Sequence, residues 1–430
     1  MNRTRGAFRF GHVPDDRHPG RCAAPPLRPR VATTVGDADH GAHGLRGVGL
    51  AIGGSGLGLV DMEVEGGALH VLGEVTLALV LFADAARIDV RSLGREAGLP
   101  ARLLGVAMPL VIAAGAGMAL LLFPSLGVLE AALLGAILAP TDAALSQSVL
   151  HARGVPARIR QALNVESGLN DGLALPVVVV LISLASGHAR GAGDWAWFIG
   201  QQVVLGPAIG LAICVAGGWL VRRASEADWM TQDFRRLSGM ALALLAFGVA
   251  EAAGGNGFLA AFVGGLGLGH TQRDQIDDLY AFVEAEGQFL MLLVFTALGA
   301  LLIGPALARS TWRSWLYVAA SLTVVRMVPV GLSMLGARAR LDTTSFLGWF
   351  GPRGLASLLF ALLLIEDGTM PHRDEVFAVV ILTVFASVLL HGLTAAPLSK
   401  LYGRRLQEAE GLMEHEDVTE HPLRVRASEN

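Results

Sequence analysis

Residues 160–184 read Arg-Gln-Ala-Leu-Asn-Val-Glu-Ser-Gly-Leu-Asn-Asp-Gly-Leu-Ala-Leu-Pro-Val-Val-Val-Val-Leu-Ile-Ser-Leu. The stretch is apolar enough to cross a membrane, yet it contains Glu166 and Asp171. A carboxylate at the centre of a membrane helix costs about 2.5–3.5 kcal/mol on insertion scales, so it persists where it faces a protein interior or a wet cavity. Asp171 lies roughly 15 Å along the helix from Arg160. The stretch therefore predicts a membrane helix with a working polar site near its middle.

The composition of the whole chain also indicates a membrane protein. Of its 430 residues, 53% are hydrophobic and 16% are charged, whereas soluble domains carry about 25% charged residues. Arginines cluster between apolar runs, and the formal net charge is −4, so nucleic-acid binding is not expected. Cys22 and Cys214 are too few for a disulfide framework or a thiolate metal site. We expect an all-α polytopic membrane protein.

Long apolar runs recur along the chain, as membrane helices require. They predict about eleven full spans, near residues 71–88, 101–123, 126–150, 162–186, 195–221, 236–253, 256–269, 280–304, 312–336, 345–365 and 376–399. Arginine-rich and arginine-poor loops alternate between the earlier runs, which fits the positive-inside rule. The basic residues Lys400, Arg404 and Arg405 place the C-terminus on the cytoplasmic side.

The two ends of the chain differ from this pattern. Residues 1–45 are rich in Pro, Arg, Gly and His without apolar periodicity, which predicts a disordered or non-native N-terminus rather than a signal peptide. Residues 47–60 resemble the second half of a membrane helix more than a nucleotide-binding loop. We therefore expect a transmembrane domain over 46–400 and a cytoplasmic tail over 401–430.

Two of the predicted spans have polar, Pro-containing breaks, at 139–142 and at 348–354. The loop charges make these spans run in opposite directions, in inverted positions of the two halves of the chain. Paired interrupted helices of opposite direction indicate the midplane ion site of a secondary transporter. Simple Pro kinks, which membrane helices tolerate, are the alternative interpretation. Because each break carries an ionisable residue, we favour an inverted-repeat transporter.

The polar residues of 164–172 offer oxygen atoms only. Helical spacing places Glu166 above Asn170 and Ser167 above Asp171 on one face. Hard alkali cations prefer such oxygens, and the stretch lacks the thiolate or imidazole set that would indicate zinc, copper or iron. Burial beside Asn170 predicts a raised pKa for Asp171, so that a proton and a sodium ion compete for it. Alternatively, Glu166 caps the helix end and Asn170 only packs.

Other deep charges need partners in the protein. Arg326 lies in the middle of its span, and its planar fork favours a carboxylate, either Glu166 or Asp142. Arg353 is expected to complement the carbonyl groups exposed at the second break, or Asp142 directly. Asp84 is the remaining deep carboxylate, and a placement near the helix end is its alternative.

Four motifs together carry a family resemblance. The motifs are Ala139-Pro-Thr-Asp142, the stretch 164–172, Asn256-Gly-Phe-Leu-Ala-Ala-Phe-Val-Gly-Gly265 and Gly351-Pro-Arg-Gly354. In this order, over about residues 47–400, they resemble the signatures of the monovalent cation:proton antiporter-1 family, the NhaP and NHE type of sodium/proton exchanger. The resemblance implies crossed broken helices, a homodimer and a dimer domain that rocks against a core.

The resemblance also assigns roles to individual residues. It implies that Asn170 and Asp171 bind the ion and that Thr141 and Ser167 add oxygen ligands, so that Na⁺ is held by Asp171, Asn170, Ser167 and Thr141. Asp142 falls in the same cation- and proton-binding site. Glu166 and Arg326 resemble a structural ion pair, and Asp84 and Arg353 are supporting residues. Family members have about thirteen spans, so the first and most of the second are expected to be missing or replaced.

These expectations combine into a predicted function. The chain is expected to exchange a monovalent cation for H⁺ across the plasma membrane, with Na⁺ as the favoured cation. The exchange is expected to need no cofactor and to move no net charge. A non-coupled cation channel and an inactive or truncated homologue are alternatives. An intramembrane aspartyl protease built on Asp142 and Asp171 is a further one, although its Gly-x-Gly-Asp context is missing.

Overall fold

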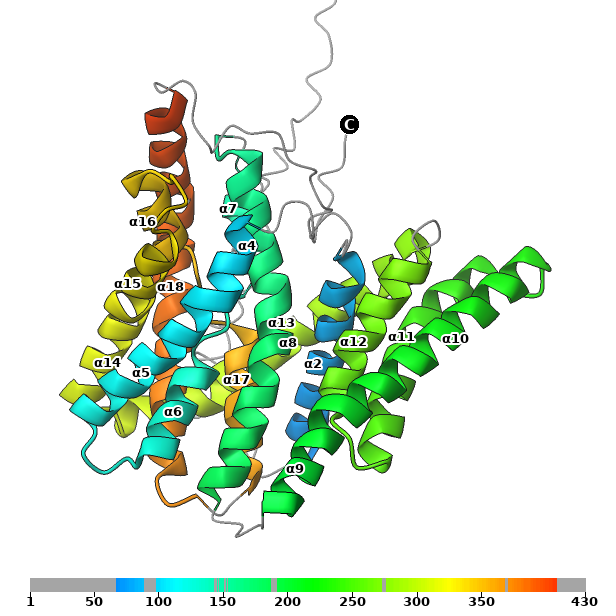
Figure 1. The fold of residues 1–430 in the computed structure, drawn as a ribbon, viewed down its shortest axis with the longest axis horizontal. Helices are drawn as coiled ribbons and strands as arrows, with labels where there is room; N and C mark the ends of the chain where they lie inside the picture. Colours follow the sequence, from blue (N-terminus) through cyan, green and yellow to red (C-terminus); the bar gives the residue numbers. More distant parts are fainter. Residues whose placement is uncertain are drawn as a thin grey trace, which may run out of the picture. The chain divides into compact units, whose positions relative to one another are not determined.

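The computed structural model describes residues 67–88, 98–142, 145, 147–150, 152, 154–186, 192–272, 276–367 and 370–407. These residues belong to one compact unit, Gly36–Asn430. Within them, every regular element is a helix (Figure 1), which confirms the all-α class. The predicted N-terminus 1–45 and most of the predicted tail 401–430 lie outside the described residues.

The helices follow the predicted apolar ranges in order. They are α2 (Gly67–Arg87), α4 (Gly98–Arg102), η1 (Leu103–Ala107), α5 (Met108–Leu122), α6 (Val128–Ile137), α7 (Gln147–Leu150), α8 (Ala157–Ala185), α9 (Ala192–Gly200), η3 (Gln201–Leu205), α10 (Gly206–Glu226), α11 (Gln232–Ala252), α12 (Gly257–Thr271), α13 (Ile276–Ala308), α14 (Trp312–Leu322), α15 (Val324–Ser333), α16 (Leu341–Trp349), α17 (Leu355–Asp367) and α18 (Arg373–Gln407). In this described part, six helical stretches are long and apolar enough to cross a membrane. The chain is therefore a multi-pass membrane protein, while the count of about eleven spans stays a prediction.

Both predicted helix breaks are present. Helix α6 ends at Ile137, and residues 138–142 leave the helical path. Helix α16 ends at Trp349, and residues 350–354 connect it to α17. Each break contains a proline, which cannot donate a backbone hydrogen bond and disfavours helix in the residue before it. The second break is shorter than predicted, because Gly348 is still helical.

A third interruption divides the predicted span 312–336 and was not expected from the sequence. Thr323, between α14 and α15, has φ −120° and ψ −94°. Its hydroxyl donates to Ala319 O at 2.6 Å, and its backbone N–H bonds Ala320 O at 3.2 Å. In a continuous helix, the backbone N–H of Thr323 would donate to Ala319 O. At the interruption, the Thr323 hydroxyl thus occupies the carbonyl that the backbone N–H would use in a continuous helix.

The helices form two groups by their contacts. Helices α2, α10, α11, α12 and α13 pack on one another, whereas α5, α6, α8 and α14 to α18 form the second group, which contains both breaks. Figure 1 shows α2, α12, α11 and α10 side by side, with α8 and α17 between them and the α5, α14 and α15 region. Helices α8 and α17 contact α2 and so join the two groups.

Glycines allow the helices of the first group to approach closely. A Cβ atom added to Gly210 of α10 would overlap the backbone of Ala260 in α12. On α12, Cβ atoms on Gly265 and Gly269 would overlap the backbone carbonyls of Phe82 and Ala86 in α2. Small residues at such positions are a common device of membrane helix packing, because they allow backbones to approach. Helix α12 is thereby fixed between α10 and α2.

Gly210→Ala is expected to destabilise the protein, because the added methyl group meets backbone rather than a flexible side chain. Overpacking of this kind costs about 1–3 kcal/mol. The thermal unfolding temperature of the purified protein in detergent measures the effect. Gly248→Ala on α11 is the matched control, since a Cβ there meets nothing within 4 Å. Equal unfolding temperatures for the two variants would contradict the packing argument.

Candidate cation and proton site

The two broken helices meet at their breaks through backbone and side-chain hydrogen bonds. The backbone N–H of Asp142 donates to Pro352 O at 2.8 Å. From the start of α17, the Ser357 hydroxyl donates to Ile137 O at 2.7 Å, at the end of α6. The two breaks, more than 200 residues apart in the chain, therefore lie against each other. This juxtaposition agrees with the crossed arrangement that the family resemblance implies.

Asp142 caps the start of α17. Its Oδ2 accepts the backbone N–H of Leu355 at 2.9 Å, and its Oδ1 lies 3.4 Å from the N–H of Leu145. A Cβ on Gly354 would overlap the Asp142 carboxylate, so glycine is required for this approach. A carboxylate at a helix N-terminus satisfies free N–H groups and complements the positive end of the helix dipole. The cap accounts for the burial of Asp142, and its predicted part in ion binding stays a prediction.

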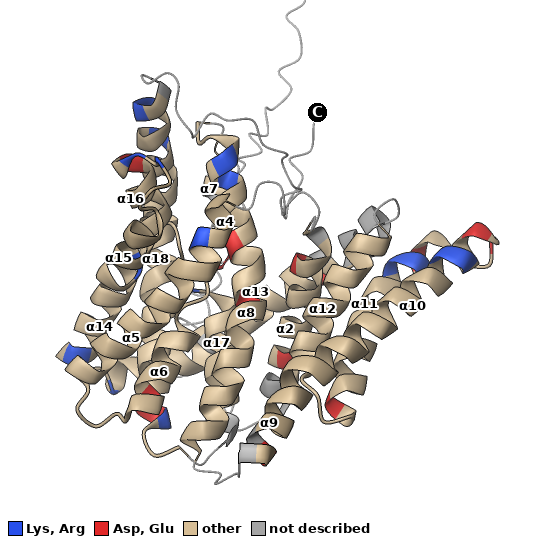
Figure 2. Cartoon of the chain, viewed as in Figure 1, with Lys and Arg blue, Asp and Glu red and all other residues tan. Residues whose placement is uncertain are grey.

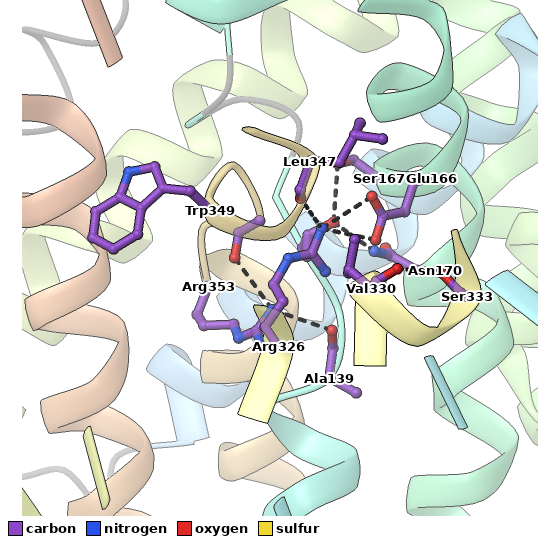
Figure 3. A network of polar contacts seen from close by, with 12 residues as sticks. Ala139, Glu166, Ser167, Asn170, Arg326, Val330, Ser333, Leu347, Trp349 and Arg353 are labelled. Carbon is purple, nitrogen blue, oxygen red and sulfur yellow. Dashed lines mark hydrogen bonds and ion pairs between the residues drawn. The ribbon is translucent and has the colours of Figure 1, made fainter. Parts of the chain in front are cut away.

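Arg353 places a positive charge near the C-terminal ends of α6 and α16. Its Nη1 donates to Gly351 O at 3.2 Å and to Ala139 O at 3.4 Å (Figure 3). The side chain is completely buried. A cation near the carbonyl end of a helix complements the negative end of the dipole. Arg353 thus serves the second break, as predicted, and also the first break, where α6 ends.

Three predicted ligands are linked by hydrogen bonds between α8 and the first break. The Asn170 amide Nδ2 donates to Thr141 Oγ1 at 2.7 Å, and Thr141 Oγ1 lies 3.1 Å from Ser167 Oγ. All three side chains are buried. Among the described residues, Asn170 Oδ1 is buried without a hydrogen-bond partner. Asn170 therefore holds Thr141 with its nitrogen and keeps its oxygen available.

Asp171 follows Asn170 on α8 and is 7% exposed. It lies in the middle of the 29-residue helix, as the sequence predicts. Beside it, a Cβ on Gly172 would lie 2.7 Å from the Phe262 ring of α12. The carboxylate is thus held at depth on the helix that carries Ser167 and Asn170.

Glu166 and Arg326 form a buried ion pair. Arg326 Nη2 lies 2.9 Å from Glu166 Oε1 and 3.0 Å from Oε2 (Figure 3). The two side chains are 5% and 3% exposed, and the same nitrogen donates to Leu347 O at 3.4 Å. A Cβ on Gly351 would overlap the guanidinium group. Of the two partners predicted for Arg326, the structure selects Glu166, which is therefore an ion-pair residue and not a cap of the helix end.

Asp84 lies on α2, in the helix group without the breaks. It is 8% exposed, on a helix that contacts α8. Its position is buried, and its supporting role stays a prediction.

The sodium/hydrogen exchanger transmembrane family matches residues 44–401 of the chain. The chain belongs to this family. The match covers the whole described helical region up to residue 401 and includes every predicted site residue. It supports the resemblance that the four motifs carry.

Individual relatives agree with this membership. The Na(+)/H(+) antiporter NhaP of Pseudomonas aeruginosa is 29% identical over 366 residues, covering 78% of this chain and 82% of the relative. The K(+)/H(+) antiporter NhaP of Alkalimonas amylolytica is 25% identical over 357 residues, covering 82% of this chain. The chain spans 61% of that relative's length.

A solved structure shares the fold. The sodium proton antiporter MjNhaP1 from Methanocaldococcus jannaschii superimposes with a TM-score of 0.67 at 20% sequence identity. The superposition covers 84% of this chain and 92% of that one. This structural match confirms the fold class predicted from the sequence, that of an inverted-repeat transporter.

Sequence reasoning missed the polar side chains of α18 that contact the second break. Ser387 Oγ accepts the backbone N–H of Arg353 at 2.7 Å, and His391 Nε2 lies 2.9 Å from Trp349 O. One signal was available: these two polar residues stand four positions apart in an otherwise apolar run, which puts them on one helix face.

Removing one member of the Glu166–Arg326 pair is expected to destabilise the protein strongly. Glu166→Leu leaves a buried guanidinium without its counter-charge, which costs about 3–5 kcal/mol. The double variant Glu166→Leu, Arg326→Leu is expected to recover much of this loss. Unfolding temperatures of the three proteins test this double-mutant cycle.

The exposed pair of Arg222 and Glu226, with side chains 42% and 59% exposed, provides the control. Glu226→Leu is expected to change stability by less than about 1 kcal/mol, because water already screens that pair. If Glu166→Leu were as mild as Glu226→Leu, the buried pair would not be a structural element.

Proposed function

We propose that the chain exchanges one Na⁺ for one H⁺ across the membrane and that Asp171 binds either ion in turn. The observation that carries this proposal is the buried Asp171 on α8, directly after Asn170 and one helical turn from Ser167, both of which are linked to Thr141 where two broken helices meet. Sites of secondary transporters lie near the membrane midplane at such interrupted helices.

The chemistry of the site suits an alkali cation. Asp171, Ser167, Thr141 and the free Asn170 Oδ1 offer hard oxygen atoms, which Na⁺ prefers. The Asn170 amide fixes Thr141 in place before a cation arrives. The cation then exchanges part of its hydration shell for ligands that are already ordered, so little ordering free energy is lost on binding.

Exchange follows from the presence of one carboxylate for two ions. A proton on Asp171 removes the charge that attracts Na⁺, and a bound Na⁺ opposes protonation. The site therefore carries one ion at a time. If the site opens to one side of the membrane at a time and only the occupied forms reorient, movement of a cation in one direction requires movement of a proton in the other.

The other charges near the site are already used, which supports electroneutral exchange. Glu166 is neutralised by Arg326 at 2.9 Å, and Asn170 is neutral where a second aspartate would add charge. Asp142 and Arg353 serve complementary helix ends. Asp171 then changes between a protonated and a sodium-bound form that have the same net charge.

Potassium is the second candidate cation, because one relative of 25% identity is named as a K(+)/H(+) antiporter. A non-coupled channel and an inactive homologue remain alternatives, and they differ from antiport in measurable ion movements. An intramembrane aspartyl protease has less support, since Asp142 is engaged by the backbone amide of Leu355. Transport in place of enzymatic catalysis is part of the proposal.

We further propose a plasma-membrane location, a cytoplasmic C-terminus and a homodimer. The basic residues Arg404 and Arg405 at the end of α18 support the orientation by the positive-inside rule, and Figure 2 shows basic residues in blue at that end of the helix. The family resemblance supports the dimer. Crosslinking in native membranes tests the dimer independently of transport.

Everted membrane vesicles that contain the chain are expected to show Na⁺-dependent proton movement. Asp171→Asn should abolish it, because an amide does not take up a proton at neutral pH and lacks the negative charge with which the carboxylate attracts Na⁺. Asp374→Asn is the matched control, since Asp374 is 61% exposed at the start of α18. Undiminished flux in Asp171→Asn would refute the role of Asp171.

Reconstituted antiport is expected to proceed at the same rate at zero and at an imposed membrane potential. Moving one net charge would couple transport to about 2.3 kcal/mol per 100 mV, which changes the rate measurably. Parallel measurements with Na⁺ and K⁺ identify the cation. Sodium movement without proton movement would indicate a channel, and a potential-dependent rate would contradict electroneutrality.

A further inference from the structure

The second helix break leaves one donor and one acceptor that a continuous helix would have joined. In a helix, the N–H of residue 353 donates to the carbonyl of residue 349. Here, residues 350–354 leave the helical path, so Arg353 N–H and Trp349 O are separated. The N–H of Gly351 donates to Trp349 O at 2.8 Å, which occupies one lone pair of that carbonyl. The second lone pair and the Arg353 N–H need partners from elsewhere.

Helix α18 supplies both partners from one face. Ser387 Oγ accepts the Arg353 N–H at 2.7 Å, and His391 Nε2 lies 2.9 Å from Trp349 O. The two residues are four positions apart, so they lie one helical turn from each other. Both are buried, with 0% and 2% exposure. Ser387 thus replaces the missing acceptor of the helical hydrogen bond, and His391 replaces the missing donor.

The two side chains are also linked to each other. His391 Nδ1 lies 3.2 Å from Ser387 Oγ and 2.8 Å from Ser387 O. Since Ser387 Oγ accepts from Arg353, its own hydrogen is available for Nδ1. In the doubly protonated form, Nδ1 donates to Ser387 O and Nε2 donates to Trp349 O, whereas in the neutral form protonated on Nε2 only Nε2 donates to a carbonyl. The contact with the break therefore requires a proton on Nε2.

Trp349 is held to α18 by further contacts. Its indole Nε1 donates to Thr394 Oγ1 at 3.0 Å, and its ring centroid lies 5.2 Å from that of His391. The end of α16 is thus fixed to α18 through both its backbone and its side chain.

We infer that Ser387 and His391 form a positioning pair that keeps α16 and α17 separated and thereby sets the place of Arg353 and of the first break. An unsatisfied buried donor or acceptor is costly, so loss of either side chain favours another path for residues 350–354. Arg353 bonds Ala139 O, and Pro352 O accepts the N–H of Asp142. A shift of the second break therefore moves the segment that carries Thr141.

Hydrogen–deuterium exchange of the full chain in lipid nanodiscs tests the pair without requiring transport. Ser387→Ala and His391→Leu are expected to raise the exchange rate of the amides at 350–355 by about 10-fold or more, because a lost buried bond opens the segment. His391→Gln is expected to restore most of the protection, since its amide nitrogen can take the place of Nε2. Thr383→Val is the matched control on α18, because Thr383 is fully buried and donates to Val379 O of its own helix.

Unchanged exchange at 350–355 in both Ser387→Ala and His391→Leu would overturn the inference, as would a Gln variant as unprotected as the Leu variant. These outcomes are readable even if the chain transports nothing, so they are separate from a failure of the proposed function.

The transport readout rests on the proposed function and distinguishes positioning from proton carrying. His391→Leu is expected to raise the apparent KM for Na⁺ by about 5- to 30-fold, because the ligands at the first break lose their order. His391→Gln should keep the pH profile of the wild type. Loss of one limb of the profile in the Gln variant would make His391 a proton carrier and overturn the positioning role.

Discussion

Water does not reach the hydrocarbon core of a bilayer, so a backbone N–H or C=O group freed there must bond within the protein. The two broken helices free such groups at the depth of the site. Each charged residue at the breaks meets part of this need: Asp142 accepts from the start of α17, and Arg353 donates to Ala139 O and Gly351 O, just beyond α6 and α16. Both charges therefore stabilise the crossing, next to which Thr141, Ser167 and Asn170 are linked.

This constraint also bears on the different roles of the carboxylates of Asp142, Glu166 and Asp171. Asp142 is held by backbone groups and Glu166 by Arg326, so both have fixed protein partners. Asp171 lies beside a hydroxyl and amide network whose Asn170 oxygen is left open. In the proposed function, Asp171 carries the exchangeable charge, and Asp142 and Glu166 stabilise the surrounding helices. The preorganised ligands and the fixed helix ends are two aspects of the same architecture.

Much of this arrangement follows from hydropathy and from the cost of buried charge. Polar residues in apolar runs marked both breaks, Glu166, Asp171 and Arg326, because membrane burial makes such residues exceptional. Charge alone left Glu166 and Asp142 equally acceptable as the partner of Arg326, whereas the family resemblance implied Glu166, and the ion pair in the structure agrees with the resemblance. The interruption at Thr323 could not be predicted, because a threonine whose hydroxyl bonds the carbonyl four residues earlier also occurs inside an unbroken helix, as at Thr383. Ser387 and His391 on α18 could not be identified from the sequence, because their partners are the backbone groups Arg353 N–H and Trp349 O, which lie at the second break.

The glycines of α12 have a consequence for how this sequence can vary. Gly265 and Gly269 face the backbone of α2 so closely that no side chain fits, although neither residue is one of the proposed ion ligands. Selection for packing would preserve them as strictly as selection for transport preserves Asp171. If natural variants of this sequence all kept these glycines, the reason would be the close packing of α12 on α2. Such invariance would then not indicate a part in ion binding.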